Sequence, residues 1–178
     1  LGDNQKLRAI FEQEVTTWVT LEKHPNIVRC FYMDTLDNQP FMILEWIAGE
    51  EGKGTDLRGW LRHGPLDLRT ALGFTIDICR GLIHADKKQP GIVHRDLKPE
   101  NIMVRDGVAM VTDFGISKVF SEVGGDQLTQ AGTAMGTPAY MSPEQGKGEK
   151  VDARSDIYAL GVMLYEMVTG QVPYEAET

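Results

Sequence analysis

Two short stretches of this 178-residue chain combine carboxylate, ammonium and amide side chains in a way that could do chemistry. Residues 94–101 read HRDLKPEN, which matches the signature H-R-D-L-x-x-x-N at every position. Residues 113–115 read DFG and begin twelve positions after Asn101. Carboxylate and amide oxygens are the ligands that a hard cation such as Mg²⁺ prefers, and a carboxylate can also accept the proton of a hydroxyl group. The residue types therefore indicate chemistry that depends on positioned charge.

A third stretch follows these two in chain order. Residues 136–144 read GTPAYMSPE and match the end of a kinase activation segment, with Ser142 where the commoner motif has Ala. Together the three motifs resemble the catalytic domain of a serine/threonine protein kinase, and the resemblance covers essentially the whole chain. The letters SPEQ at 142–145 and VDARSDIY at 151–158 are similar to those of bacterial kinases of the eukaryotic-like type.

The resemblance implies a reaction and four catalytic residues. The reaction is transfer of the γ-phosphate of ATP, bound with Mg²⁺ or in its place Mn²⁺, to serine or threonine hydroxyls of proteins. Asp96 would orient the substrate hydroxyl, and Lys98 would neutralise charge on the transferring phosphate. Asn101 and Asp113 would be oxygen ligands of the metal. The alternative is that the chain descends from kinases but has lost the catalytic activity.

The resemblance also implies a nucleotide-binding site, which would be formed by Lys98 and by four further residues that contact ATP through apolar side chains or the backbone. Residues 44–47 look like the hinge, with Leu44 as gatekeeper. The backbone of Glu45 and Ile47 would hydrogen-bond adenine, and Met103 would pack under its ring. Plain strand core is the alternative interpretation of these apolar side chains.

Regulatory residues are implied around the catalytic loop. Arg95, beside Asp96, predicts a site for a phosphate on the activation loop, because the fork of an Arg side chain matches phosphate oxygens. Thr133 is the first candidate for phosphorylation and Thr129 the second, with autophosphorylation expected. Thr137 would hydrogen-bond Asp96 and Lys98 rather than be modified.

Glu14 matches the helix carboxylate that pairs with the strand lysine of the small lobe. Its spacing from the His-Pro pair at 24–25 is one residue longer than is commonest, so Glu12 and a shifted helix stay open as alternatives. A solvated helix carboxylate is the other interpretation. His94 and Phe114 are expected to stack, and Asp156 to hold the backbone of residues 94–95 or simply to cap a helix.

The expected fold is α+β: a partial small lobe, made of the regulatory helix and two hinge-side strands at 1–47, and the first part of a helical large lobe at 48–178. The sequence pattern predicts helices at 4–23, 56–62, 67–84 and 155–169, strands at 27–33 and 41–47 joined by a turn at 37–40, and a hairpin at 102–105 and 108–112. In the 67–84 helix, one face would carry Leu68, Leu72, Ile76, Cys79 and Ile83.

The glycine-rich loop and the strand lysine of the family are absent from the sequence. We therefore expect a kinase domain truncated at both ends, whose isolated chain binds MgATP weakly and turns over little. A non-catalytic scaffold is the alternative function if the truncated chain is the native product. A small-molecule kinase is disfavoured because residues 136–144, which dock a peptide, are present, and Lys98 disfavours tyrosine specificity.

Composition sets the remaining expectations. The net charge of −8 and pI near 5.0 argue against nucleic acid as a partner. No apolar window of 18 residues occurs, so no membrane contact is expected within this range, although the parent protein can carry an anchor elsewhere. The predicted setting is the cytoplasm, and the predicted partners are protein substrates and a second kinase molecule.

Overall fold

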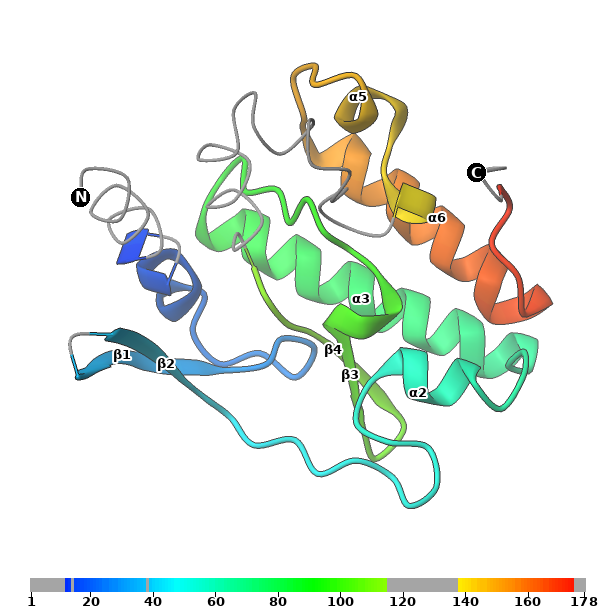
Figure 1. Cartoon of the computed structure of the whole chain (residues 1–178), viewed down its shortest axis with the longest axis horizontal. Coiled ribbons are helices and arrows are strands. Elements are labelled where there is room, and N and C mark those ends of the chain that lie inside the picture. Colours follow the sequence, from blue (N-terminus) through cyan, green and yellow to red (C-terminus); the bar gives the residue numbers. More distant parts are fainter. Residues whose placement is uncertain (1–11, 14, 38, 115–137, 175–178) are drawn as a thin grey trace.

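Helices and two small antiparallel sheets make up the part of the chain that the structure describes (Figure 1). The computed structural model describes residues 12–13, 15–37, 39–114 and 138–174. In chain order the elements are β1 (Cys30–Leu36), β2 (Gln39–Leu44), α2 (Leu57–Leu61), α3 (Leu68–Lys88), η1 (Pro99–Asn101), β3 (Ile102–Arg105), β4 (Val108–Val111), η2 (Pro138–Tyr140), α5 (Pro143–Gly146) and α6 (Ala153–Thr169). The chain is also helical at 12–13 and 15–20. The predicted α+β mixture is confirmed.

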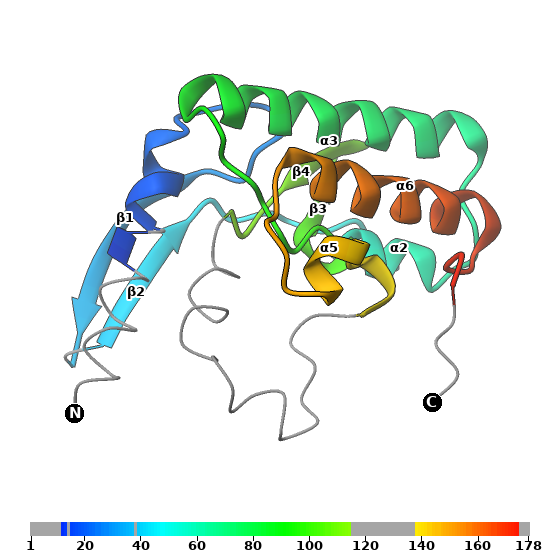
Figure 2. The ribbon, with the colours of Figure 1, turned by 90° about the horizontal axis from the view of Figure 1, so that it is seen from above.

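The two long helices form the centre of the larger part. α3 and α6 lie side by side and run in opposite directions, and the β3–β4 hairpin packs against α3 (Figures 1 and 2). Three of the described helices begin at an aspartate that caps them: Asp56 for α2, Asp67 for α3 and Asp152 for α6. The prediction that Asp156 could simply cap a helix is therefore wrong, because α6 begins earlier than expected.

The hairpin β1–β2 is shifted along the sequence from its predicted position. Pairing runs from Leu36 opposite Gln39 to Cys30 opposite Leu44, whereas strands had been expected at 27–33 and 41–47. Pro40 lies inside β2, opposite Thr35, which an edge strand tolerates.

Residues 26–28 explain the shift, because they pair elsewhere. The Val28 N–H donates to Val111 O at 2.9 Å, and the Val111 N–H donates to Asn26 O at 2.9 Å. The side chain of Asn26 also donates to Ala109 O at 3.0 Å. The apolar run at 27–28 thus joins the smaller, N-terminal part of the chain to β4 rather than extending β1.

The same connection is held by the helices on either side. Trp18 Nε1 donates to Val28 O at 3.0 Å, and the His84 ring donates through Nε2 to Leu21 O at 2.7 Å. His24 stacks on His84 with ring centroids 4.4 Å apart. The two parts of the fold are therefore joined by several independent contacts.

The buried face of α3 is different from the one that its large apolar residues suggest. Leu68, Leu72, Ile76 and Ile83 do share a face, but they are 43–63% exposed, and Cys79 is only partly buried. The buried residues are Ala71, Phe74, Ile78, Gly81 and Ala85. Small side chains mark the core face because α6 and the connection at 26–28 approach the helix closely there.

Gly81 gives a stability prediction. A Cβ at this position would lie 2.6 Å from Asn26 O, a backbone atom, whereas a Cβ at Gly73 on the exposed face of α3 would meet nothing within 4 Å. Gly81→Ala should therefore lower the free energy of unfolding by about 1–3 kcal/mol through overpacking. Gly73→Ala should raise it by up to about 1 kcal/mol through helix propensity.

Urea denaturation of both variants measures this difference. Equal stabilities for the two variants would contradict the close approach of α3 to Asn26.

Among the described helices, none combines the length and the hydropathy needed to span a bilayer.

Candidate active site

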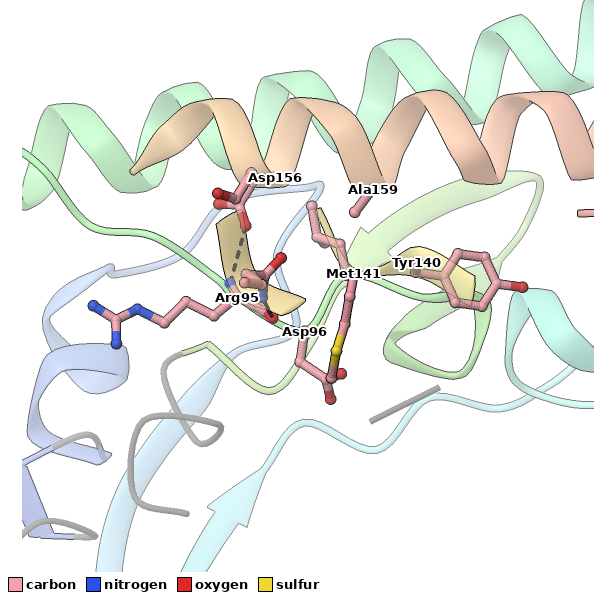
Figure 3. Close-up of a pocket in the computed structure, with 9 residues that line it drawn as sticks. Arg95, Asp96, Tyr140, Met141, Asp156 and Ala159 are labelled. Atoms are coloured by element: carbon pink, nitrogen blue, oxygen red, sulfur yellow. Dashed lines mark hydrogen bonds between the residues drawn. The ribbon is translucent and has the colours of Figure 1, made fainter. Parts of the chain in front are cut away.

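A strained backbone at Arg95 begins the catalytic loop. Arg95 has φ of 70°, in the left-handed region that residues with a side chain seldom adopt. The Asp156 carboxylate, only 5% exposed, holds it in place by accepting the His94 N–H at 2.8 Å. It also accepts the Arg95 N–H at 2.9 Å (Figure 3). The prediction that Asp156 holds this backbone is confirmed.

His94 packs inside the loop and is buried. Its Nε2 donates to Thr112 O at 2.7 Å, and its Nδ1 accepts the Asp96 N–H at 3.3 Å. Phe114 meets the ring edge-on, with centroids 5.0 Å apart, so the two rings are in contact, but edge to face rather than stacked as predicted. Both ring nitrogens are used in structural bonds, and His94 acts here as a support for the loop.

Lys98 and Asn101 converge on one carboxylate oxygen of Asp96. Lys98 Nζ lies 2.8 Å from Asp96 Oδ2, and Asn101 Nδ2 donates to the same oxygen at 3.0 Å. Asn101 Nδ2 also donates to Asp96 O at 2.8 Å. These bonds fix the Asp96 side chain, and because Asn101 donates through nitrogen, its Oδ1 stays available as a ligand.

The β3–β4 hairpin brings Asp113 to this cluster. Asn101 ends η1 just before β3, Ile102 pairs with Val111, and the Thr112 N–H donates to Asn101 O at 3.0 Å. Asp113 follows directly, with φ of 62°. The hairpin therefore explains why Asn101 and Asp113, twelve residues apart in sequence, lie at one place.

Asp113 is a half-buried acid that is suited to a cation. Burial raises the pKa of its carboxyl, and the charge of Asp96 raises it further, whereas His94 and Lys98 oppose the shift. Within the described residues the carboxylate has no direct hydrogen bond or salt bridge. The same part of the chain holds no group of three or more His, Cys, Asp or Glu suited to a metal. An Asp–Asn pair fits Mg²⁺, which usually keeps water and substrate phosphate as its other ligands.

The predicted hinge follows β2. Leu44 is the last strand residue, and the Glu45 N–H donates to Arg29 O at 2.8 Å. Arg105 holds the Glu45 side chain at 2.6 Å and lowers its pKa. Ile47 is buried at 7% exposure, and Met103 in β3 is half-buried. Among the described residues, neither Glu45 O nor the Ile47 N–H takes part in a backbone hydrogen bond of the connecting segments.

The predicted regulatory residues are described only in part. Arg95 has no ion-pair partner among the described residues, and its side chain extends away from Tyr140 and Met141 (Figure 3). Glu14, Thr129, Thr133 and Thr137 lie outside the described residues.

An ionic network that the sequence did not reveal adjoins the catalytic loop at Glu100. Arg58 of α2 bonds Glu100 of η1 through Nε at 2.8 Å and Glu166 of α6 through Nη1 at 2.6 Å. It also donates to the Tyr140 hydroxyl, which itself donates to Glu166. Burial alone would lower the pKa of Arg58, but the bonds to Glu166, Glu100 and Tyr140 raise it.

The partners of Arg58 are 42, 82 and 108 positions away, so no local pattern could have identified them. Burial, followed by hydrogen bonding to Glu166, raises the pKa of the Tyr140 hydroxyl. The network joins α2, η1, η2 and α6, and η1 is itself the end of the 94–101 stretch.

Comparison with known proteins identifies the family. The family model described as "Protein kinase domain" matches residues 2–178. The chain belongs to the protein kinase domain family. A solved structure, a single-residue mutant of the PknI kinase domain of Mycobacterium tuberculosis, superposes with a TM-score of 0.71 at 21% identity, covering 95% of this chain and 59% of that one. This match confirms the predicted kinase-type fold.

Bacterial serine/threonine kinases are the curated relatives of this kinase domain. A probable serine/threonine-protein kinase of Clostridium perfringens is 35% identical over 178 residues, which cover 99% of this chain and 24% of the relative. PrkC of Bacillus subtilis is 35% identical over 179 residues, covering 99% and 26%. The chain thus spans about a quarter of the length of these relatives. The predicted resemblance to bacterial serine/threonine kinases is confirmed.

Proposed function

We propose that the protein carrying this domain transfers the γ-phosphate of MgATP to serine and threonine hydroxyls of proteins. The observation that supports the proposal most is the convergence of Lys98 and Asn101 on Asp96, with Asp113 held beside them by the hairpin. Phosphoryl transfer asks a protein for such positioning and charge stabilisation rather than for covalent chemistry. The relatives' serine/threonine kinase names agree with this reaction.

Asp96 has the role of orienting the substrate hydroxyl and accepting its proton. The bonds from Lys98 and Asn101 hold one of its oxygens and leave the other to face the substrate. Lys98 is the cation next to the reacting groups, where it stabilises the negative charge of the transferring phosphate. All three residues act from fixed backbone, because Asp156 and His94 anchor the loop.

Asn101 and Asp113 are the residues that would hold Mg²⁺. The orientation of the Asn101 amide fits this role, and so does the half-buried carboxylate of Asp113, which bonds none of the described residues directly. When bound, the metal supplies charge neutralisation to the ATP phosphates. The Glu45 carbonyl and the Ile47 N–H would bond adenine between Leu44 and Met103, and Lys98 completes the nucleotide contacts.

Regulation would act through the loop that follows Phe114. Arg95 would bind a phosphate on Thr133 or Thr129 after autophosphorylation, Thr137 would contact Asp96, and Glu14 would pair with a lysine of the small lobe. We also infer a division of the domain into a small-lobe part at 1–47 and a large-lobe part at 48–178. A cytoplasmic setting, protein substrates and self-association of the kinase belong to the same proposal.

The test is a transfer assay on the natural-length protein. The protein is incubated with Mg²⁺, γ-labelled ATP and peptides that differ only in a Ser, Thr or Tyr acceptor, and its own modified residues are mapped by mass spectrometry. We expect label on Ser and Thr peptides and on Thr133 or Thr129. ATP binding without any transfer would favour a scaffold instead, and transfer to Tyr alone would contradict the proposed specificity.

A further inference from the structure

The peptide unit that joins Arg95 to Asp96 is held at both of its polar ends. Its N–H, from Asp96, donates to His94 Nδ1 at 3.3 Å. Its carbonyl, from Arg95, accepts a hydrogen bond from Gln145 Nε2 at 2.7 Å. Gln145 lies in α5, 50 positions further along the chain. The plane of this peptide sets the direction in which the Asp96 side chain leaves the backbone.

The other end of the Gln145 amide has a separate task. Its Oε1 accepts the Ser142 N–H at 3.2 Å and the Ser142 hydroxyl at 3.1 Å, and Ser142 Oγ accepts the Gln145 N–H at 3.4 Å. This is the capping box that begins α5. Because the carbonyl of Arg95 can only accept and the Ser142 N–H can only donate, the amide can satisfy both neighbours in one orientation only.

The surroundings make the bond to Arg95 more than a surface contact. Ser142 is 1% exposed, and a small pocket lies where the loop meets α5 and α6 (Figure 3). Arg95, Asp96, Gln145 and Asp156 are among the residues that line it. Without Gln145 the Arg95 carbonyl would lose its hydrogen bond, and a backbone with φ of 70° would be held only by Asp156 and by the bond from the Asp96 N–H to His94.

We propose that Gln145 is a positioning residue for Asp96, and that it couples the catalytic loop to the segment that ends at α5. The inference rests on the proposed kinase function. It adds Gln145, which follows the 136–144 motif, to the residues that support the catalytic site. The bond that matters is the one donated by Nε2, and the capping box alone is the competing explanation for the side chain.

Gln145→Glu separates the two explanations. Glutamate is a capping-box residue in its own right, so it keeps the acceptor for Ser142, but it has no N–H to donate to Arg95 O. Gln145→Met removes the acceptor and the donor together. Gln171→Glu, an exposed site beyond the far end of α6, is the matched control for an added negative charge.

The experiment measures kcat and KM of the natural-length protein and its variants, with thermal melting and hydrogen exchange of residues 93–98. We expect kcat to fall about tenfold or more in both Gln145 variants, since small misplacements of a catalytic group are costly. The KM for ATP should stay within about twofold, and the melting temperature of Gln145→Glu should match that of the Gln171→Glu control. Exchange at 93–98 should be faster in both Gln145 variants.

The outcomes are distinguishable. If Gln145→Glu kept the wild-type kcat and only Gln145→Met lost activity, the side chain would serve only as a helix cap, and the inference would be overturned. A wild-type protein without Asp96-dependent transfer would overturn the proposed function, and the role of Gln145 with it.

Discussion

Replacing Asp96 by Asn is expected to reduce phosphate transfer by about three orders of magnitude while leaving ATP affinity within a few-fold. Asn keeps the size of the side chain and can still accept from Lys98, which lies 2.8 Å from Asp96 Oδ2. It cannot take up the proton of a substrate hydroxyl, and proton transfer by a positioned group is worth about 10²–10⁴ in rate. The measurement is kcat on a Ser or Thr peptide together with calorimetric titration of MgATP.

Asp106→Asn is the matched control for this change. Asp106 is exposed, lies in the turn between β3 and β4 and has φ of 54°, a conformation that Asn also tolerates. The kcat of the Asp106→Asn variant should equal that of the wild type. A transfer rate in Asp96→Asn within tenfold of the wild type would show that another group activates the hydroxyl.

Replacing Arg58 by Met is expected to cause the largest loss of stability among the changes considered. Glu166 has a side chain only 8% exposed and would remain with the Tyr140 hydroxyl as its described partner, while its charge stays buried. Breaking a buried pair on one side costs about 3–5 kcal/mol. Because the Arg58 side chain is 25% exposed, we expect the free energy of unfolding to fall by about 2–4 kcal/mol, as measured by chemical denaturation.

The double variant Arg58→Met with Glu166→Gln tests the cause. The new amide would still accept from the Tyr140 hydroxyl but carries no charge, so the second substitution should restore about half or more of the lost stability. If the two substitutions were simply additive in their destabilisation, the buried charge would not be the origin of the effect.

The grouping of the candidate catalytic residues could be predicted because most of them lie close together in sequence. Asp96, Lys98 and Asn101 lie within six residues, and the turn at Asp106 predicts the hairpin that brings Asp113 to them. The structure contains that hairpin in the predicted register, so Asp113 follows a strand that pairs beside Asn101. The catalytic roles of these residues stay predictions until the transfer assay is done.

What the sequence could not supply are contacts that depend on tertiary packing. The apolar stripe of α3 at Leu68, Leu72 and Ile76 was assigned from periodicity, but small residues such as Gly81 allow the closest approach and so define the core face. Periodicity likewise could not show that Val28 pairs with β4. Both features were out of reach for one reason: periodicity describes the order of apolar residues along one segment, whereas packing depends on contacts between segments that are distant in sequence.

Gln145 and Arg58 were missed for a related reason. Each bonds groups more than 40 positions away, and neither residue type is unusual in a short or exposed helix. Only the folded chain reveals that Gln145 reaches the Arg95 carbonyl and that Arg58 reaches Glu166.

A crystal structure of the natural-length protein with Mg²⁺ and a non-hydrolysable ATP analogue tests the central claim most directly. The account predicts a metal bound by Asn101 Oδ1 and the Asp113 carboxylate at about 2.0–2.1 Å. It also predicts adenine bonded to the backbone of Glu45 and Ile47, and Asp96 facing the terminal phosphate. A nucleotide bound without metal at these two oxygens, or bound elsewhere on the domain, would contradict it.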